Sequence, residues 1–436
     1  MKRPIFYWNQ KGHASLKPVP NPQMLPFERK FMADYNKLRE EAELISQSCR
    51  LRGVKNADVH KVLSLNDQYR LRGAQITQLN TVKHNDPNNR EEAIKKRETL
   101  SKLETERTEI EKEMVEEALK LPNLIHPHVT HTEPKLIRTS GEKPKGEPLD
   151  HVTLGRDLDL FDFHQSTSIT AEKFVYLKNE AAILEMALIH WAMTFVVSRG
   201  FTPVLPPDLI RQEVALACGF SPKGEKGTKS HIYSIEDSDL CLTGTAEIPL
   251  TALYANRVIP AELFPIKMVG FGHCFRMEPA ANRGLYRLHQ FSKVEMVNIC
   301  LPEQSERQFE EMLDIQEELY SQLGLHYRVL DMPPDDLGAP AYRKFDIEAW
   351  MPHKQDYGEI SSLSNCTDYQ SRRLAMRYKD ENKKNYYPHT LNGTALAVPR
   401  VLLAIMENCQ SEGVVHIPQV LHPYTMGLKE IKIKRE

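Results

Sequence analysis

The feature that most constrains this chain is a pair of long apolar seams between Asp58 and Leu121. In each seam, apolar residues recur in alternating steps of three and four, the spacing of one face of an α-helix. The seams are Val62, Leu65, Tyr69, Ile76 and Leu79, and then Leu100, Leu103, Ile110, Met114, Ala118 and Leu121. The turn-rich stretch HNDPNNREE separates them, and Pro122 and Pro127 follow the second. The pattern predicts an antiparallel helical hairpin that ends at these prolines.

A hairpin of this length has little core of its own, which leaves two interpretations. It is either a dimerisation coiled coil or spacer, or an arm that reaches toward a large partner. Arg72 and Arg107 are the single charged interruptions of the two seams, and the first helix is mildly basic. Because a charged helix face is usually only solvated, the hairpin alone does not decide between the two.

The composition favours a large soluble fold with one small and one large domain. Of 436 residues, 41% are hydrophobic and 27% charged, and the net charge of −2 gives no global basic field. A polyanionic partner would therefore be bound by local patches. Seven cysteines lie far apart without a CxxC pair, so we expect reduced buried thiols and no zinc site. We find no run of about 18 apolar residues and expect no membrane span.

The N-terminus is basic and free of acidic residues until Glu28. Lys2, Arg3, Lys11 and Lys17 suit an organelle transit peptide. Four prolines between positions 4 and 22 interrupt any amphipathic helix, so a draped terminus is an equal alternative. We assign residues 1–29 to a leader or disordered N-terminus.

Three further regions follow along the chain. Residues 30–127 form the helical arm domain, 128–170 are rich in proline, glycine and charge and are expected to form a linker, and 171–436 form the large domain. We expect a helix from about Ala171 to Arg199, then short alternating strands, and a closing helix after Val398. Such alternation without intervening helices favours an antiparallel sheet flanked by helices, an α+β fold with a polar working face. The glycine-rich phosphate loops GxGxxG and GxxxxGK[ST] are absent from the sequence.

The stretch CFRMEPAANRGLYRLHQFSKVEM, from Cys274 to Met296, carries unusually many charges for a pair of strands. We expect Arg276 and Glu278 to share one face of the first strand, and a turn near residues 279–284 to follow. On the returning strand, one face would carry Arg287, His289, Phe291 and Glu295. Arginines bind phosphates, an aromatic ring stacks on a purine, and a carboxylate accepts from an amine. These parts suit a nucleoside triphosphate beside an amino acid, although an ion-paired surface hairpin is the common alternative.

Four segments, taken together with their order along the chain, resemble motifs of class II aminoacyl-tRNA synthetases of the seryl type. FRMEP…RGLYRLHQFSKVEM resembles motif 2, LTGTAEIPL the TxE loop, GEISSLSNCTDYQSRR the strand before motif 3, and NGTALAVPRVLLAIMEN motif 3. The hairpin is similar to the tRNA-binding arm of that family, and the resemblance runs from about residue 30 to 425. Details such as the AVPR of motif 3 look most like mitochondrial members, which implies a location in the mitochondrial matrix.

The resemblance implies a serine--tRNA ligase that activates L-serine with ATP to seryl-adenylate and transfers it to tRNA(Ser). Arg276 and Arg400 would be catalytic. The implied ATP-binding residues are Arg276, Glu278, Arg287, Phe291, Glu359, Ser362 and Arg400, with Glu359 and Ser362 also holding Mg²⁺. The implied serine-binding residues are Thr245, Glu247, Arg276, Glu295, Asn392 and Thr394. His289 has no implied chemistry and is expected to pack in the strand.

The family arm binds tRNA largely through backbone contacts, and our candidates for phosphate contacts are Arg70, Arg72, Lys83, Lys95, Lys96 and Arg97. The family dimerises through motif 1, here the helix around Leu184 to Arg199 and the strand through Pro206. A homodimer is implied, and a heterodimer with a synthetase-like paralogue is the alternative.

The chain departs from the family pattern in motif 2, where only the five residues PAANR separate Glu278 from Gly284. Family members usually have a longer loop there that touches the acceptor end of the tRNA. The alternative function is therefore a catalytically inactive paralogue that serves in mitochondria as a tRNA-binding or dimer-partner protein. Such a copy would be expected to have lost part of the nucleotide set, and Arg276, Glu278 and Arg400 are all present.

Overall fold

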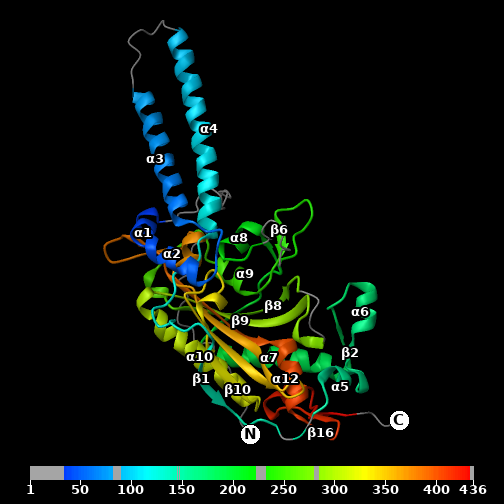
Figure 1. The fold of residues 1–436 in the computed structure, drawn as a ribbon. Helices are drawn as coiled ribbons and strands as arrows, with labels where there is room; N and C mark the ends of the chain where they lie inside the picture. Colours follow the sequence, from blue (N-terminus) through cyan, green and yellow to red (C-terminus); the bar gives the residue numbers. More distant parts are fainter. Residues whose placement is uncertain are drawn as a thin grey trace.

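A computed structural model describes residues 34–432 apart from 82–89, 145, 147, 222–231 and 279–283. Two long helices form an arm that projects from a body built around a sheet (Figure 1). The predicted leader, the turn between the arm helices, Lys83 and the PAANR stretch lie outside the described residues.

The arm confirms the predicted hairpin. It consists of α3 (Val59–Thr81) and the antiparallel α4 (Arg90–Lys120), with α1 (Tyr35–Glu40) and α2 (Ala42–Leu51) at its base. Asp34 caps α1 by accepting from the backbone N–H groups of Asn36 and Lys37. Near the body the seam is buried, with Val62, Leu65 and Met114 in one cluster. We call α1, α2 and residues 121–124 the arm root.

The two arginines that interrupt the seams link the two helices. Arg72 Nε donates to Glu106 at 2.8 Å, and Arg107 Nη2 donates to the Tyr69 hydroxyl at 2.9 Å. The Arg107 guanidinium also lies over the Tyr69 ring, 4.3 Å from its centre. These interruptions therefore pair across the hairpin, and Arg72 would have to exchange its ion pair with Glu106 for an RNA phosphate.

The body contains an eight-stranded sheet. Its order is β1 (Lys135–Ser140), β10 (Tyr327–Asp331), β11 (Arg343–Met351), β12 (Asp356–Asn365), β15 (His389–Ala397), β9 (Gln290–Cys300), β8 (Ile266–Phe275) and β4 (Thr202–Val204). All neighbours are antiparallel except β4 and β8. The α+β fold predicted from the alternating runs is therefore correct.

Three helices cover one face of this sheet: α7 (Asn179–Ser198), α10 (Ser305–Gln322) and α12 (Val398–Asn408). Their apolar sides meet even-numbered residues of β9, such as Val294 and Met296, in the main core. The opposite face is closed at one end by a second core, against α8 (Gln212–Ala217), α9 (Glu247–Ala252) and α11 (Tyr369–Arg373). Between these covers, the second face presents polar side chains.

Short elements complete the described body. Small strands form the pairs or sheets β2 (Phe161–Asp162) with β3 (Tyr176–Leu177), β5 (Leu209–Arg211) with β6 (Leu240–Leu242), β7 (Val258–Ile259) with β13 (Arg377–Lys379) and β14 (Asn385–Tyr386), and β16 (Gln410–Ser411) with β17 (Val414–His416) and β18 (Glu430–Ile431). Helices α5 (His151–Asp157) and α6 (Phe163–Ile169) lie beside β2, and 3₁₀ turns cover Ala261–Leu263, Gly284–Tyr286, Pro302–Gln304, Pro334–Asp336 and Gln419–Leu421. All seven cysteines are free, and six are buried.

Two boundaries differ from the sequence expectations. Residues 128–170 are not a simple linker, because β1 pairs with β10 and His151 is buried with Nδ1 2.8 Å from Glu407 of α12. The large domain's first helix begins at Asn179, not near 171, because residues 176–177 pair with 161–162 in a short sheet.

Helix α7 is relevant to the expectation that the chain has no membrane span. By length and composition alone it could cross one, and it is the one helix of this kind in the described residues. Part of it is packed in the main core, through Leu184, Leu188 and Trp191.

Candidate active site

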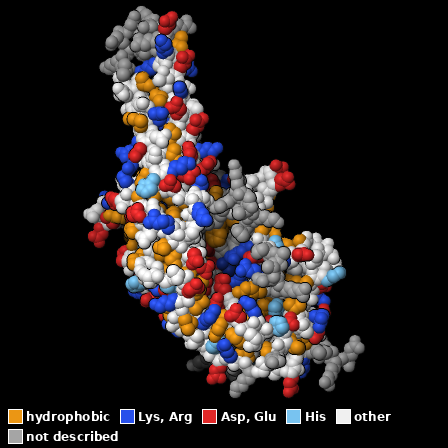
Figure 2. All heavy atoms as spheres, viewed as in Figure 1, with side chains coloured by type: hydrophobic (Ala, Val, Ile, Leu, Met, Phe, Trp, Pro, Cys, Tyr) orange, Lys and Arg blue, Asp and Glu red, His pale blue; other side chains and the backbone are white. Residues whose placement is uncertain are grey.

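A cavity opens on the polar face of the sheet, between the ends of β8 and β9, the middle of β12 and the start of α12. Its enclosed space is about 80 Å³. Among its lining residues are Arg276, Glu278, Arg287, Phe291, Lys293, Glu359, Ser362, Thr394 and Arg400. Figure 2 shows basic and acidic side chains gathered in a hollow of the body below the arm. The structure thus brings segments more than a hundred residues apart in sequence to one wall.

The three arginines all line this cavity, each held by a different partner. Arg276 Nε donates to the carbonyl of Gly244 at 3.1 Å, and its guanidinium carbon lies 5.3 Å from the centre of the Phe291 ring. Arg287 pairs with Glu278 at 2.9 Å. Arg400, near the start of α12, lies 3.2 Å from the Glu359 carboxylate and also donates to its carbonyl.

Arg276, Glu278, Arg287 and His289 do not lie within the strands, which differs from the sequence expectation. Strand β8 ends at Phe275 and β9 begins at Gln290, because the ladder closes at that pair. Arg276 reaches the cavity from just beyond the ladder, where its N–H still bonds to the carbonyl of His289. His289 itself stacks on Phe174 and bonds to the Tyr233 hydroxyl, so it packs beside the cavity and does not line it.

Glu359 carries a negative charge toward these cations. Burial opposes its ionisation, but Arg400, Lys344 and Arg276 together outweigh that effect and lower its pKa. The neighbouring Asp346 responds in the opposite direction, because burial and the charge of Glu359 raise its pKa to about 7. Neighbouring carboxylates whose pKa values are shifted in opposite directions are typical of sites that bind a cation or a reacting group.

The donors around Glu359 fit a hard cation such as Mg²⁺. Asp346 of β11 lies opposite Ser362 of β12, and its Oδ2 is 3.1 Å from Lys344. Its other oxygen, Oδ1, is buried without a hydrogen-bond partner in the described part of the chain. Carboxylate and hydroxyl oxygens are the ligands that Mg²⁺ prefers, so Glu359, Ser362 and the orphan oxygen of Asp346 make a chemically suitable set.

A second polar group lies buried next to the cavity. Glu295 of β9 pairs with Lys293 and accepts from the Thr394 hydroxyl at 3.4 Å. Burial raises the pKa of Glu247 to about 7, and Glu295 adds to the effect. Thr245 Oγ1 accepts from the backbone N–H of Glu247 at 3.2 Å, which fixes the loop before α9.

Asn392 of β15 is buried and donates to the sulfur of Cys366 at 3.4 Å. Five of the residues to which the resemblance assigns serine binding are buried, and two of the full set, Arg276 and Thr394, line the cavity.

Three site residues have no role in the sequence analysis. Lys293 lies between Phe291 and Glu295 on the same face of β9, so strand parity alone could have revealed it. Asp346 and Gln370 carry no local signal, because only the fold brings them to Glu359 and Glu247.

The candidate RNA contacts lie on the arm, away from this cavity. Arg70, Lys95 and Arg97 are exposed, and Lys96 is half-exposed and has a partner. Arg72 is the exception, because it pairs with Glu106.

Comparison with known proteins gives a consistent result. Residues 232–409 match the model of the class II tRNA synthetase core domain (G, H, P, S and T). The chain is 41% identical over 423 residues to a serine--tRNA ligase from Treponema denticola, covering 90% of this chain and 98% of that protein. It is 42% identical over 420 residues to one from Rubrobacter xylanophilus, covering 90% and 97%.

Solved structures agree with these relatives. Seryl-tRNA synthetase from Pyrococcus horikoshii, complexed with ATP, superposes with a TM-score of 0.83 at 34% identity, covering 93% of this chain and all of that one. The cytoplasmic serine-tRNA ligase from Naegleria fowleri, in complex with AMP, gives 0.79 at 28% identity, covering 92% and 99%.

Proposed function

The chain belongs to the seryl-tRNA synthetase family of class II aminoacyl-tRNA synthetases, and from this premise we propose which of its residues carry the reaction. The enzyme is an ATP-dependent serine--tRNA ligase. The observation that carries the residue assignment is the convergence of Arg276, Arg287 and Arg400 on one cavity that also contains Glu359. Three guanidinium groups beside a carboxylate suit a metal-bound triphosphate.

On the nucleotide side, we assign each group by its chemistry and position. Arg276 holds the α-phosphate and the serine carboxylate, and Arg287 and Arg400 bind the β- and γ-phosphates. Phe291 stacks on the adenine, and Glu278 accepts from the adenine amino group. Its present ion pair with Arg287 would give way to these contacts when ATP binds.

The chemistry then needs no protein nucleophile. The serine carboxylate attacks the α-phosphorus and pyrophosphate leaves, after which a terminal ribose hydroxyl of tRNA(Ser) attacks the adenylate carbonyl and AMP leaves. The protein contributes alignment and charge neutralisation, and good alignment is worth about 7–11 kcal/mol. Mg²⁺, when bound, would neutralise phosphate charge, and Glu359, Ser362 and Asp346 are the residues that would hold it.

On the amino acid side, Thr245, Glu247 and Glu295 surround the serine ammonium and hydroxyl, and Asn392 and Thr394 close the pocket. A pocket that bonds a hydroxyl rejects alanine by several powers of ten, because its buried polar groups would be left unpaired. Threonine must be excluded by size, which is the harder discrimination.

We propose that two copies associate through α7 and the adjoining β4 region. Met186 of α7 is 56% exposed and Leu205, just after β4, is 80% exposed, although both are large and apolar. Large apolar side chains that are left exposed on neighbouring elements suit a protein interface. A homodimer covers this face with a second copy, and a paralogue in its place would give a heterodimer.

We propose a mitochondrial matrix location, which the basic, acid-poor leader at 1–29 supports. Fusing residues 1–29 to a fluorescent reporter tests it directly. Import of the reporter into mitochondria is expected, and a diffuse cytosolic signal would contradict the proposal.

We propose that the arm binds the tRNA backbone through exposed cations of α3 and α4, namely Arg70, Lys95 and Arg97. Lys96 is a weaker candidate because another contact occupies it. Lys83 remains a candidate from the sequence.

Serine-dependent exchange of pyrophosphate into ATP tests the activation step, with threonine and alanine as controls. We expect exchange with serine alone, followed by charging of tRNA(Ser). Absence of exchange would favour the alternative, a catalytically inactive paralogue that binds tRNA or a dimer partner. Exchange without charging would implicate the five-residue PAANR stretch.

A further inference from the structure

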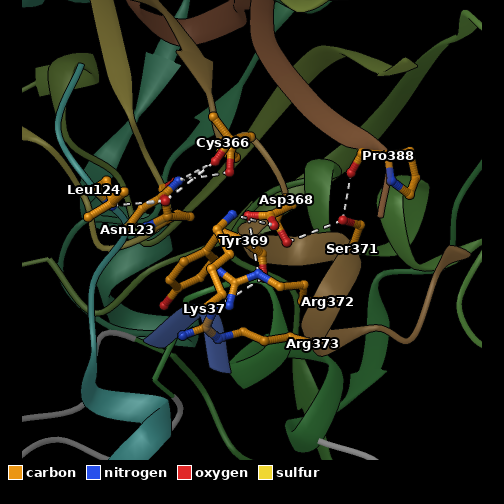
Figure 3. A network of polar contacts seen from close by, with 12 residues as sticks. Lys37, Asn123, Leu124, Cys366, Asp368, Tyr369, Ser371, Arg372, Arg373 and Pro388 are labelled. Atoms are coloured by element: carbon orange, nitrogen blue, oxygen red, sulfur yellow. Dashed lines mark hydrogen bonds and ion pairs between the residues drawn. The ribbon is translucent and has the colours of Figure 1, made fainter. Parts of the chain in front are cut away.

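One short segment touches both the arm root and the serine pocket. It runs from Cys366, directly after β12, to Arg373 at the end of α11, and we call residues 366–373 the bridge segment. Figure 3 shows it in the middle of a polar network, with Asn123 and Lys37 approaching from the arm root.

On the arm side, two buried residues fasten the bridge segment. Asn123, just beyond the end of α4, is 5% exposed, and its Nδ2 donates to the carbonyl of Cys366 at 2.8 Å and to the Thr367 hydroxyl at 3.0 Å. Arg373 donates in return to the carbonyl of Leu121 at 3.1 Å. The position of the arm root is therefore tied directly to this segment (Figure 3).

On the pocket side, the same segment contacts two residues of the serine site. Gln370 is fully buried, and its Nε2 donates to the Glu247 carboxylate at 2.7 Å. Its side-chain oxygen accepts from the Thr390 hydroxyl at 2.7 Å, which fixes the orientation of the amide. The sulfur of Cys366 accepts from Asn392.

The backbone between these contacts is strained. Thr367 has φ of +44°, which a β-branched residue rarely adopts. It is held there from several directions: its N–H donates to Asn365, its carbonyl accepts from the N–H of Thr390, and its hydroxyl contacts Asn123. Because such a conformation persists only where its surroundings impose it, the geometry of the bridge segment depends on contacts from both sides.

We propose that the arm root positions the serine pocket through the bridge segment. Asn123 and Arg373 fix the segment, and Gln370 thereby fixes the Glu247 carboxylate that receives the serine ammonium. The inference rests on the serine-binding role proposed for Glu247. All three are positioning residues, because none of them lines the nucleotide cavity.

The first test separates serine binding from nucleotide binding. Asn123→Asp keeps a side-chain oxygen that accepts from Leu124 and can accept from the Thr367 hydroxyl, but it loses the donor to the carbonyls of Cys366 and Pro340. Leaving buried acceptors unpaired weakens such a contact about 10- to 100-fold. We expect the KM for serine in pyrophosphate exchange to rise by that factor, with the KM for ATP unchanged.

A matched control and a second test variant accompany it. Arg39→Ala removes an exposed ion pair to Asp67 within the arm and touches no residue of the bridge segment, so its KM for serine should equal that of the unsubstituted enzyme. Thr367→Gly relieves the strained φ and removes the hydroxyl contact to Asn123, so it should fold as stably as the parent and still raise the KM for serine.

A second pair of variants tests the pocket side. Thr390→Val keeps the shape of the side chain but removes the hydrogen bond that orients Gln370, and we expect the KM for serine to rise about 3- to 10-fold. Thr390→Ser keeps the donor and should restore the parent value.

The outcomes are distinguishable. A lower unfolding temperature in Asn123→Asp with an unchanged KM for serine would show a purely structural role and overturn the inference. Equal rises in the KM values for serine and ATP would also overturn it, because they indicate general loosening. If the unsubstituted enzyme neither binds serine in calorimetry nor exchanges pyrophosphate, the proposed function itself fails.

Discussion

Replacing Glu247 with glutamine should stabilise the fold while removing serine activation. Glu247 is buried, and it faces Glu295 and Lys293 of β9, Arg276 beyond β8, and Gln370 of α11. Burial is the largest influence and the charge of Glu295 the next, and together they raise its pKa from 4.5 to about 7. Glutamine keeps an oxygen that can accept from Gln370, so the hydrogen bond of 2.7 Å has a substitute.

The size and sign of the effect follow from proton binding. A shift from 4.5 to about 7 corresponds to about 3 kcal/mol, at about 1.4 kcal/mol for each pKa unit. Between these pH values the folded protein keeps a proton that the unfolded chain has released, so the contribution of Glu247 to stability falls as pH rises. Below pH 4.5 there is no penalty, and above pH 7 the full penalty applies.

Thermal unfolding at pH 5, 6, 7 and 8 measures this contribution when the parent and Glu247→Gln are compared at each pH. We expect the variant's advantage to be small at pH 5 and to grow to about 3 kcal/mol at pH 8, or about 3–6 °C for a domain of this size. Thr251→Ser, a conservative change in the same helix, serves as the control for general effects on α9.

The functional half of the prediction uses the same variant. Serine-dependent pyrophosphate exchange should be lost in Glu247→Gln, and in the parent the KM for serine should rise as pH falls below about 7, because the protonated carboxyl no longer attracts an ammonium group. A difference in unfolding temperature that stays constant from pH 5 to pH 8 would refute the reasoning.

Three further predictions concern other parts of the molecule. Arg276→Ala should abolish exchange while gel filtration still shows a dimer; exchange at the parent rate would remove the assignment of Arg276. Leu205→Asp should yield monomers in sedimentation, because it places a charge on the exposed apolar face, and an intact dimer would exclude that face. Arg70→Ala should reduce by about 1 the slope of the logarithm of tRNA affinity against the logarithm of salt concentration. Arg72→Ala should mainly reduce the helicity of the arm, because it removes the ion pair to Glu106. An unchanged slope in Arg70→Ala would mean that Arg70 contacts no phosphate.

The arm and the class of the sheet could be predicted because both rest on repeating patterns. The seam spacing of α3 and α4 and the alternation of the strands each involve many residues, so errors at single positions average out. The edge strand β1 was missed because its residues KLIRTS are nearly all exposed and show no alternation of burial. An edge strand is paired on one side only, and its sequence is correspondingly less constrained.

Site residues divide in a similar way. Arg276, Phe291 and Arg400 occur in motifs whose spacing can be read along the chain, and the structure brings them to one cavity. Asn123 and Gln370 could not be found in this way, because their importance comes from partners more than a hundred positions away. Short-range patterns carry no information about such contacts.

The order of the strands also limits how the protein can be made. Strand β15, close to the C-terminal end of the chain, lies between β12 and β9 near the middle of the sheet. During synthesis at about 5–20 residues per second, a nascent chain therefore carries two half-sheets with open edges until residues 389–397 leave the ribosome. A chain that ends before this strand would leave both half-sheets with open edges, which favour aggregation. Chaperones should therefore bind the nascent chain mainly before residues 389–397 have been synthesised.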